Sequence, residues 1–341
     1  MFVKGSLTMN DGTDEEGKLI LALDVGGTKI AGSVLRFSSG HMPELIRLVQ
    51  EPTQAQEGGL AVLQRIVEFS CELLGRIDRE VMGIGIGAAG VIALDGSIES
   101  ATSLMPGWSG MPLGPALRAA TGKTVSVVGD VHAHALGEAH WGAGRDVSSM
   151  LLVAVGTGIG GAMVLGGHVL HGAHNVGGHI GHVCHPDARR IRCSCGRYGH
   201  VEPIASGLGI ERCYHKLSGK DARGDRIAEM ARNGDNDAQS AVLMAGRALG
   251  NTLGMQANML DPEMIVLSGS VCGAGELWLD AVRQGYQDQV IDALSDIPIV
   301  PGTLGAQAPI LGAAVPLAQY LGLIEGDEGT AVEKDPICVI S

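Results

Sequence analysis

The chain has 341 residues, of which 45% are hydrophobic, so it is long enough to bury a large core and to form two domains. Its 24 lysines and arginines stand against 37 aspartates and glutamates, and the net charge of −13 disfavours nucleic acid as a partner. No apolar run approaches the roughly 20 residues that span a membrane, so we expect no membrane partner. With 53 glycines and 3% aromatic residues, the composition is typical of a soluble, glycine-rich α/β protein.

The ends of the chain and its cysteines indicate a cytoplasmic protein. Residues 1–17 are mixed and acidic, with no secretory signal pattern, and we expect them to form a flexible tail, with a second tail over 326–341. The seven cysteines are an odd number, and only Cys193 and Cys195 are closely paired, so we expect reduced thiols. The last four residues, from Cys338, fit a prenylation tetrapeptide, but the acidic stretch before them disfavours lipidation.

Two segments far apart in the chain share one pattern of strand, glycine turn and strand. The apolar run 18–24 leads through a turn at 26–29 into a second apolar run, and residues 150–165 repeat this design around 156–161. Glycine turns after strands expose backbone N–H groups that can bind phosphate oxygens, although each turn alone could be a plain hairpin. The repetition predicts an internal duplication, with one phosphate-binding hairpin in each lobe and a lobe boundary near Val131.

The rest of the chain alternates helical and strand patterns. We predict strands over 81–88, 124–128 and 263–267, and helices over 58–74, 113–120, 132–141, 207–214, 221–232, 238–260 and 311–321. Asp24 ends a strand, where it would either cap the strand or face a magnesium ion and its phosphates. Asp130 lies where a strand stops and a helix begins, and it is open there to two interpretations, an N-cap or a catalytic carboxylate.

A short glycine- and arginine-containing loop holds four residues that are typical zinc ligands. These are His182, Cys193, Cys195 and His200. Thiolates and imidazoles are the ligands that tetrahedral zinc prefers, and no open coordination position is evident, so we predict a structural Zn²⁺ site. Cys184 and His185 could replace any of the four, and a coincidental loop is the alternative.

Several motifs, in order along the chain, resemble the ROK family of sugar kinases and sugar-responsive repressors. They are Asp24–Lys29, Gly85–Gly90, the hairpin at 150–161, Gly178–His182, and the stretch from Cys193 through Glu202 to Gly207. The resemblance covers roughly residues 18–320 and implies an α/β, two-lobed actin-like ATPase fold (ribonuclease H-like, hexokinase-type) with an interlobe cleft. We expect a smaller lobe over 18–130, a larger lobe with the zinc loop over 131–310, and a helix over 311–325 that returns to the smaller lobe. The family also implies a homodimer.

The resemblance also implies roles for single residues. Asp130 would be the general base that removes the proton of the sugar 6-hydroxyl as it attacks the γ-phosphate of ATP. The sugar would be bound by Gly90, His179, His182 and Glu202. ATP would be bound by Gly26, Gly27, Thr28 and Lys29 on the first hairpin, by Gly156, Thr157 and Gly158 on the second, and by Gly269 and Ser270 near the adenosine. Mg²⁺ would be held by phosphates and water, with Asp24 as the protein anchor.

The choice of sugar depends on a few departures from the family pattern. Glucokinases of the family carry a glutamate where this chain has His179, and this histidine resembles that of bacterial N-acetylmannosamine kinases. Family drift among hexokinases is the alternative. Gly129 and His132 also replace usual residues, as does the sequence around 103–104, and His200 replaces a family cysteine.

Only about 18 residues precede Leu19, too few for the DNA-binding domain of the family's repressors. We therefore predict an ATP-dependent sugar 6-kinase, with N-acetylmannosamine ahead of glucose. A non-catalytic sugar sensor is the alternative from another functional class.

Overall fold

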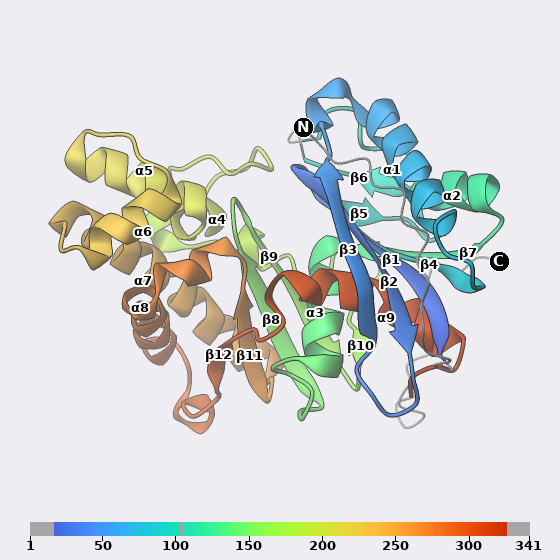
Figure 1. Cartoon of the computed structure of the whole chain (residues 1–341). Coiled ribbons are helices and arrows are strands. Elements are labelled where there is room, and N and C mark those ends of the chain that lie inside the picture. Colours follow the sequence, from blue (N-terminus) through green and yellow to red (C-terminus); the bar gives the residue numbers. More distant parts are fainter. Residues whose placement is uncertain (1–16, 103–104, 326–341) are drawn as a thin grey trace. The chain divides into compact units, whose positions relative to one another are not determined.

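The computed structural model describes residues 17–102 and 105–325 (Figure 1). The chain divides into two compact units, one formed by the segment up to Gly137 together with the segment from Ala306, and the other by Glu138–Gly305. The first division falls inside helix α3 (Asp130–Trp141), a few residues beyond the position expected near Val131. Residues 1–16, 103–104 and 326–341, which include the C-terminal tetrapeptide, lie outside the described residues.

The first unit is built on a five-stranded sheet with the order β3-β2-β1-β4-β7. Its strands are β1 (Lys18–Val25), β2 (Lys29–Phe37), β3 (Glu44–Pro52), β4 (Val81–Ala88) and β7 (Thr124–Gly129). The first three strands are antiparallel, whereas β4 and β7 run parallel to β1. A separate short pair is formed by β5 (Val91–Ile92) and β6 (Ile98–Ser100).

Helices cover both faces of this sheet. On one face, Leu21 and Leu23 of β1 pack in a buried core with Ile66 of α1 (Gly59–Leu74) and Leu117 of α2 (Leu113–Thr121). The alternate residues of β1 are also buried, and α9 (Ala308–Tyr320) contacts β1, β4 and β7 (Figure 1). The close approach of α9 requires a glycine at Gly85, where a Cβ would lie 2.3 Å from the carbonyl oxygen of Ala313. Burial of both faces explains the near-continuous apolar runs of these strands.

The second unit repeats the same topology in a sheet with the order β10-β9-β8-β11-β12. Its strands are β8 (Ser149–Val155), β9 (Ile159–Leu165), β10 (His168–Val169), β11 (Met264–Ser268) and β12 (Ile299–Pro301). Strands β8, β9 and β10 are antiparallel neighbours, and β11 and β12 run parallel to β8. The predicted duplication of the strand, glycine turn and strand unit is therefore confirmed at the level of the fold.

A helical layer packs on the second sheet. It consists of α4 (Glu202–Ala205), α5 (Gly207–Ser218), α6 (Gly224–Arg232), α7 (Asn236–Leu260) and α8 (Glu276–Gln287). The alanine-rich face of α7 contributes Ala241, Ala245 and Leu249 to a core that also contains Val153 of β8 and Ile265 of β11. Small side chains let α7 approach its neighbours closely, which explains a large core with few aromatic residues.

The predicted strands and helices are all present, with shifts at their ends. Helix α6 begins at Gly224 rather than at 221, and α9 begins at Ala308 rather than at 311. Strands β3 and β12, the short strands, and helices α4 and α8 were not predicted from the sequence. Strand β3 is an edge strand whose side chains are largely exposed or half-buried, so it lacks the strong apolar signal of the central strands.

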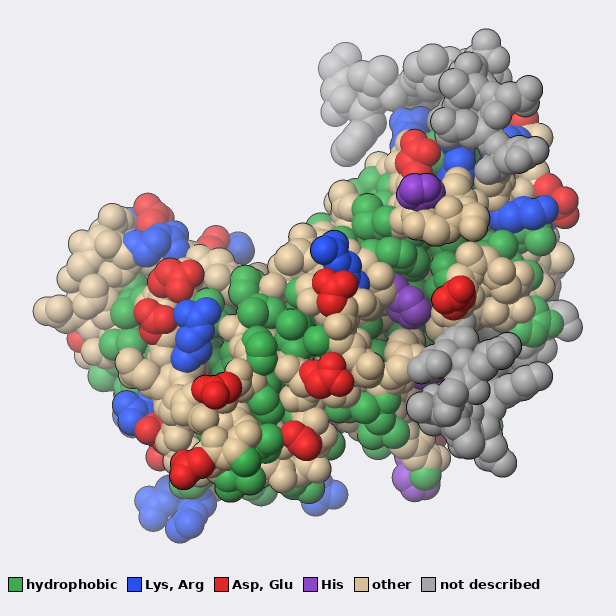
Figure 2. Space-filling view, turned by 90° about the horizontal axis from the view of Figure 1, so that it is seen from below, with side chains coloured by type: hydrophobic (Ala, Val, Ile, Leu, Met, Phe, Trp, Pro, Cys, Tyr) green, Lys and Arg blue, Asp and Glu red, His purple; other side chains and the backbone are tan. Residues whose placement is uncertain are grey.

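The surface agrees with the mixed, acidic composition. On the face drawn in Figure 2, acidic and basic side chains are interspersed among uncharged ones. In the described ranges 17–102 and 105–325, no helix is long and apolar enough to cross a membrane.

Candidate functional site

The first glycine turn joins β1 to β2 and leaves backbone donors free. The N–H of Gly26 donates to the carbonyl of Lys29 at 3.0 Å, which closes the turn. The N–H groups of Gly27 and Thr28 have no acceptor among the described residues, and both residues are exposed. Two adjacent N–H groups without acceptors at the tip of a hairpin can bind phosphate oxygens.

The second glycine turn joins β8 to β9 in the same way. The N–H of Gly156 donates to the carbonyl of Gly158 at 2.9 Å, while Thr157 and Gly158 have no acceptor for their own N–H groups in the described part of the chain. The segment after β11 lies beside this turn, because a Cβ at Gly156 would be 3.9 Å from the Ser270 hydroxyl. Gly269, with φ of +91°, allows this approach, since a Cβ there would lie 2.4 Å from the carbonyl of Val155. The structure thus brings Gly269 and Ser270 to the second turn.

Two carboxylates of the first unit influence each other electrostatically. Asp24 lies near the end of β1, paired with Ala31 and Gly87 on the neighbouring strands, and Asp130 is the first residue of α3. Burial and, to a lesser degree, the negative charge of Asp130 raise the pKa of Asp24 to about 6, and the charge of Lys29 opposes the shift. A bound cation would relieve the repulsion between two such carboxylates, so their chemistry fits Mg²⁺.

Gly90 lies close to Asp130 in this unit. It follows β4 with φ of +119°, and a Cβ at Gly129 would be 3.7 Å from the carbonyl oxygen of Gly90. The carboxylate oxygen Oδ1 of Asp130 accepts a hydrogen bond from the N–H of Val131 at 2.9 Å. The first unit therefore gathers Asp24, Asp130 and Gly90 at the carboxyl ends of adjacent strands.

The four predicted metal ligands come together in the second unit. The Nδ1 atom of His182 lies 3.5 Å from the sulfur of Cys193, and that of His200 lies 3.3 Å from the sulfur of Cys195. All four ligand atoms lie within 4.8 Å of one another. Zinc bonds of about 2.0–2.3 Å in a tetrahedron separate neighbouring ligand atoms by about 3.3–3.8 Å, so this donor set fits Zn²⁺.

Cys184 and His185, the candidate substitutes, do not join this cluster. Cys184 is exposed. His185 is buried, and its Nδ1 atom accepts a hydrogen bond from the N–H of Asp187 at 3.3 Å. The four residues whose ligand atoms lie together are therefore His182, Cys193, Cys195 and His200, and neither substitute is among them.

A tight turn holds the two cysteines on one side of the cluster. The N–H of Cys193 donates to the carbonyl of Arg197 at 2.8 Å, and the N–H of Gly196 donates back to Cys193 at 2.9 Å. Gly196 has φ of +88°, which favours glycine. His182 ends a short 3-10 helix (Ile180–His182) and faces this turn.

Glu202 links the Cys/His loop to the second glycine turn. Its Oε1 atom accepts a hydrogen bond from the Ser194 hydroxyl at 2.5 Å, and its Oε2 atom accepts one from the N–H of Ile159 at 3.2 Å. A Cβ at Gly158 would lie 2.7 Å from the same Oε2 atom, so the carboxylate touches the turn itself. Ser194 was not predicted as a site residue, although its position between two candidate cysteine ligands was a usable signal.

The exposed side chain of His179 lies beside His182. The ring centroids are 6.0 Å apart and the rings are stacked. The Nδ1 atom of His179 lies 2.9 Å from the carbonyl oxygen of Val176, so this nitrogen carries the hydrogen. The Nε2 atom is therefore the ring nitrogen left for a ligand.

A pocket of about 380 Å³ lies within the second unit, between the glycine turn and the Cys/His loop. Its lining includes Thr157, Ser194, Glu202, Arg192 and Arg212. The two guanidinium groups and the N–H groups of the turn can bind phosphate, and the Glu202 carboxylate can accept a hydrogen bond from a hydroxyl. The two arginines had no motif in the sequence that marked them.

Comparison with known proteins gives a consistent result. The sequence model described as the ROK family matches residues 20–319. A glucokinase of Halalkalibacterium halodurans is 32% identical over 311 residues, which cover 86% of this chain and 92% of the relative. The bifunctional enzyme NanE/NanK of Brucella melitensis is 31% identical over 311 residues, which cover 88% of this chain and 54% of that protein.

Solved structures agree with the sequence matches. The ROK hexokinase from Thermus thermophilus is 33% identical, with a TM-score of 0.77, over 89% of this chain and 99% of the other. A ROK family glucokinase from Streptomyces griseus, solved with glucose and AMPPNP, is 26% identical, with a TM-score of 0.73, over 87% of this chain and 98% of the other. The predicted α/β fold of the actin-like ATPases is confirmed.

Proposed function

The chain belongs to the ROK family and is a sugar kinase, and we propose that it is an ATP- and Mg²⁺-dependent 6-kinase of N-acetylmannosamine. The observation that carries the kinase proposal is the pair of glycine turns. Each unit presents one turn with two adjacent N–H groups that have no acceptor among the described residues. Such paired donors suit the phosphates of ATP.

Asp130 is the proposed general base. Its carboxylate takes the proton of the sugar 6-hydroxyl while that oxygen forms a bond to the γ-phosphorus, and the bond from this phosphorus to the bridging oxygen of ADP breaks. Burial and the charge of Asp130 raise the pKa of Asp24, and a bound cation would offset both effects, which supports Asp24 as the protein anchor of Mg²⁺. When bound, Mg²⁺ neutralises phosphate charge.

The proposed sugar-binding residues are Gly90, His179, His182 and Glu202. His179 supports N-acetylmannosamine because an imidazole whose Nδ1 atom is bonded to the Val176 carbonyl replaces the glutamate of the glucokinases, and so presents a different shape and different hydrogen bonds to the sugar. His182 directs its Nδ1 atom toward Cys193, which leaves Nε2 for a sugar hydroxyl.

The Cys/His cluster is the proposed structural Zn²⁺ site. His182, Cys193, Cys195 and His200 would complete a tetrahedron and leave no position for a reacting water. Its role would be to hold the loop that carries Ser194 and, through Ser194, the Glu202 carboxylate.

Glucose is the second candidate substrate. The relatives described as glucokinases include one that is 32% identical to this chain. We also propose a cytoplasmic location, because ATP is available there. By family resemblance we propose a homodimer, and light scattering of the purified protein would test this.

A His179→Glu substitution tests the substrate proposal. We expect it to raise the ratio of kcat/KM for glucose to that for N-acetylmannosamine by about tenfold or more, since a change of one polar contact is worth about 1–3 kcal/mol. His174→Glu, at an exposed position five residues earlier, is the matched control. An unchanged ratio in the His179 variant contradicts the assignment.

A further inference from the structure

We propose that Thr53 is a positioning residue for the first glycine turn and that Arg65 and Glu57 hold it in place. The inference rests on the proposed function, because it concerns how that turn is shaped to bind the phosphates of ATP. Thr53 lies 27 residues from Gly26 in the chain, outside every motif that points to the site.

Thr53 holds both ends of the turn. It directly follows β3, whose last residue, Pro52, pairs with Lys29 at the start of β2. The Thr53 hydroxyl donates to the carbonyl of Gly26 at 2.6 Å, and its backbone N–H donates to the carbonyl of Thr28 at 3.0 Å. The side chain is fully buried, with 0% exposure, so water does not compete for this hydroxyl.

The planar peptide bond converts this contact into a direction for a phosphate donor. The carbonyl of Gly26 and the N–H of Gly27 belong to one trans peptide unit, in which they point in opposite directions. Because the hydroxyl of Thr53 fixes the carbonyl, it also turns the N–H of Gly27 away from the protein. That N–H is one of the donors without an acceptor in the described part of the chain.

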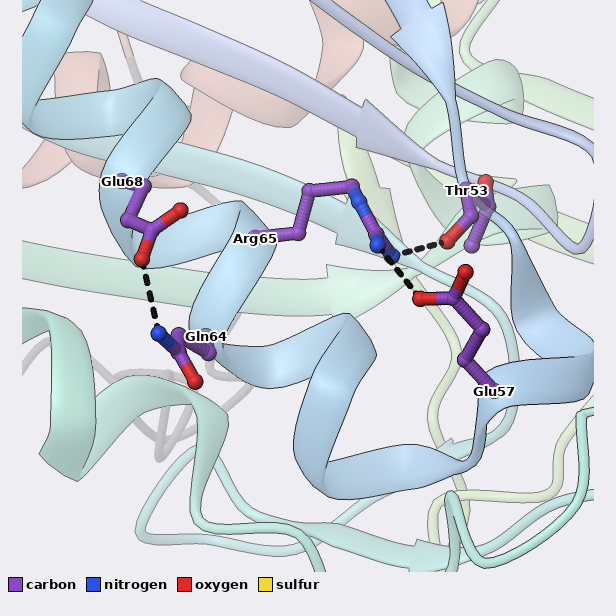
Figure 3. Close-up of polar contacts among 5 residues, drawn as sticks. All are labelled: Thr53, Glu57, Gln64, Arg65 and Glu68. Atoms are coloured by element: carbon purple, nitrogen blue, oxygen red, sulfur yellow. Dashed lines mark hydrogen bonds and ion pairs between the residues drawn. The ribbon is translucent and has the colours of Figure 1, made fainter.

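A second layer fixes Thr53 itself (Figure 3). Its carbonyl accepts a hydrogen bond from the Nη1 atom of Arg65 at 2.7 Å, and the Nη2 atom of Arg65 pairs with a Glu57 oxygen at 2.7 Å. Arg65 belongs to α1, and Glu57 ends the 3-10 helix Ala55–Glu57. The side chain of Arg65 is 22% exposed and that of Glu57 52%, so the hydrogen bond from Arg65 to the Thr53 carbonyl is the better shielded of the two contacts.

The second glycine turn is held by an equivalent contact. The carbonyl of Gly156 accepts a hydrogen bond from the N–H of Gly207 at 2.8 Å. In both units, the carbonyl of the first glycine is therefore bound from outside its own hairpin. The donors differ, since one is the Thr53 hydroxyl and the other is the Gly207 N–H, but both bind the carbonyl of the first glycine of a turn. This similarity supports a role for the two contacts in shaping the turns.

Thr53→Val removes the hydroxyl but keeps the shape and the backbone N–H. We expect the dissociation constant for Mg-ADP and the KM for ATP to rise about tenfold, with the KM for sugar within about twofold, because one buried hydrogen bond is lost. Thr53→Ser should restore most of the affinity. Thr252→Val removes an equally buried hydroxyl in α7, which bonds to Ala248, and should leave nucleotide binding unchanged.

Arg65→Ala is a second test, for the case that Thr53→Val does not fold. It should weaken Mg-ADP binding by about threefold, because the Thr53 carbonyl loses its hydrogen bond from Arg65. Gln64→Ala is its control, because the Gln64 side chain donates to Glu68 on the exposed side of the same helix (Figure 3). A folded Thr53→Val protein that binds Mg-ADP as tightly as the wild type overturns the positioning role alone. A wild-type protein that binds no Mg-ADP overturns the proposed function as well.

Discussion

Replacing Asp24 with asparagine should stabilise the first unit at neutral pH while it weakens nucleotide binding. The pKa of this carboxyl is raised from 3.8 to about 6 by burial and by the charge of Asp130. The folded state therefore binds a proton more tightly than the unfolded chain does. The contribution of the protonated Asp24 carboxyl to stability is fully present below about pH 4 and is lost as the pH rises through about 6.

The size of the effect follows from the two pKa values. The difference between 3.8 and about 6 corresponds to about 3 kcal/mol, at about 1.4 kcal/mol for each tenfold change in proton affinity. An asparagine has no charge to bury at any pH. Asp24→Asn should thus exceed the wild type in the free energy of unfolding by up to about 3 kcal/mol at pH 7.5, and by about half as much at pH 5.

Native-state hydrogen exchange of the β1 and β4 amides measures this difference in the unit that contains Asp24. Asp95→Asn is a control of opposite sign, because a hydrogen bond from the N–H of Ser97 lowers the pKa of Asp95. That variant should gain no protection at pH 7.5. An Asp24→Asn protein that gains no stability, or gains equally at pH 5 and 7.5, would refute the reasoning. The same variant should bind Mg-ATP more weakly than the wild type.

Two further predictions concern the other proposed groups. Asp130→Asn should lower kcat by about 100- to 10,000-fold, while the sugar affinity measured by calorimetry stays within about tenfold of the wild type. A variant that keeps its turnover contradicts the role of Asp130 as general base. A wild-type protein without turnover would instead be a non-catalytic sensor. Elemental analysis should find about one zinc ion per wild-type chain. Cys195→Ser should lose this zinc and melt at a lower temperature. Wild-type protein without zinc contradicts the cluster assignment.

The fold was predictable where one residue pattern dominated. The apolar runs of the central strands and the long amphipathic helices carried their own signals, and the two glycine turns predicted the duplication. Helix α8 was missed although Trp278, Val282 and Tyr286 follow helical spacing and are buried. Strand β3 was harder to predict, since an edge strand with exposed side chains has no clear alternation.

The site divides in a similar way. Ligands that cluster within one loop, such as Cys193 and Cys195, were predictable because the chemistry and the spacing lie together. Thr53 was not predictable, because its role depends on a contact with Gly26 that only the pairing of β2 with β3 creates. The tautomer of His179 likewise depends on the carbonyl of Val176, which the loop brings to it.

A coupled ADP-release assay with Mg-ATP tests the kinase activity directly, with N-acetylmannosamine, glucose, N-acetylglucosamine and mannose compared side by side. We expect sugar-dependent release of ADP, with the highest kcat/KM for N-acetylmannosamine. Preference for glucose would contradict the role given to His179 and leave the kinase intact. No ADP release with any of the four sugars, from protein that binds them, would contradict the central claim that the paired glycine turns and Asp130 form a working kinase.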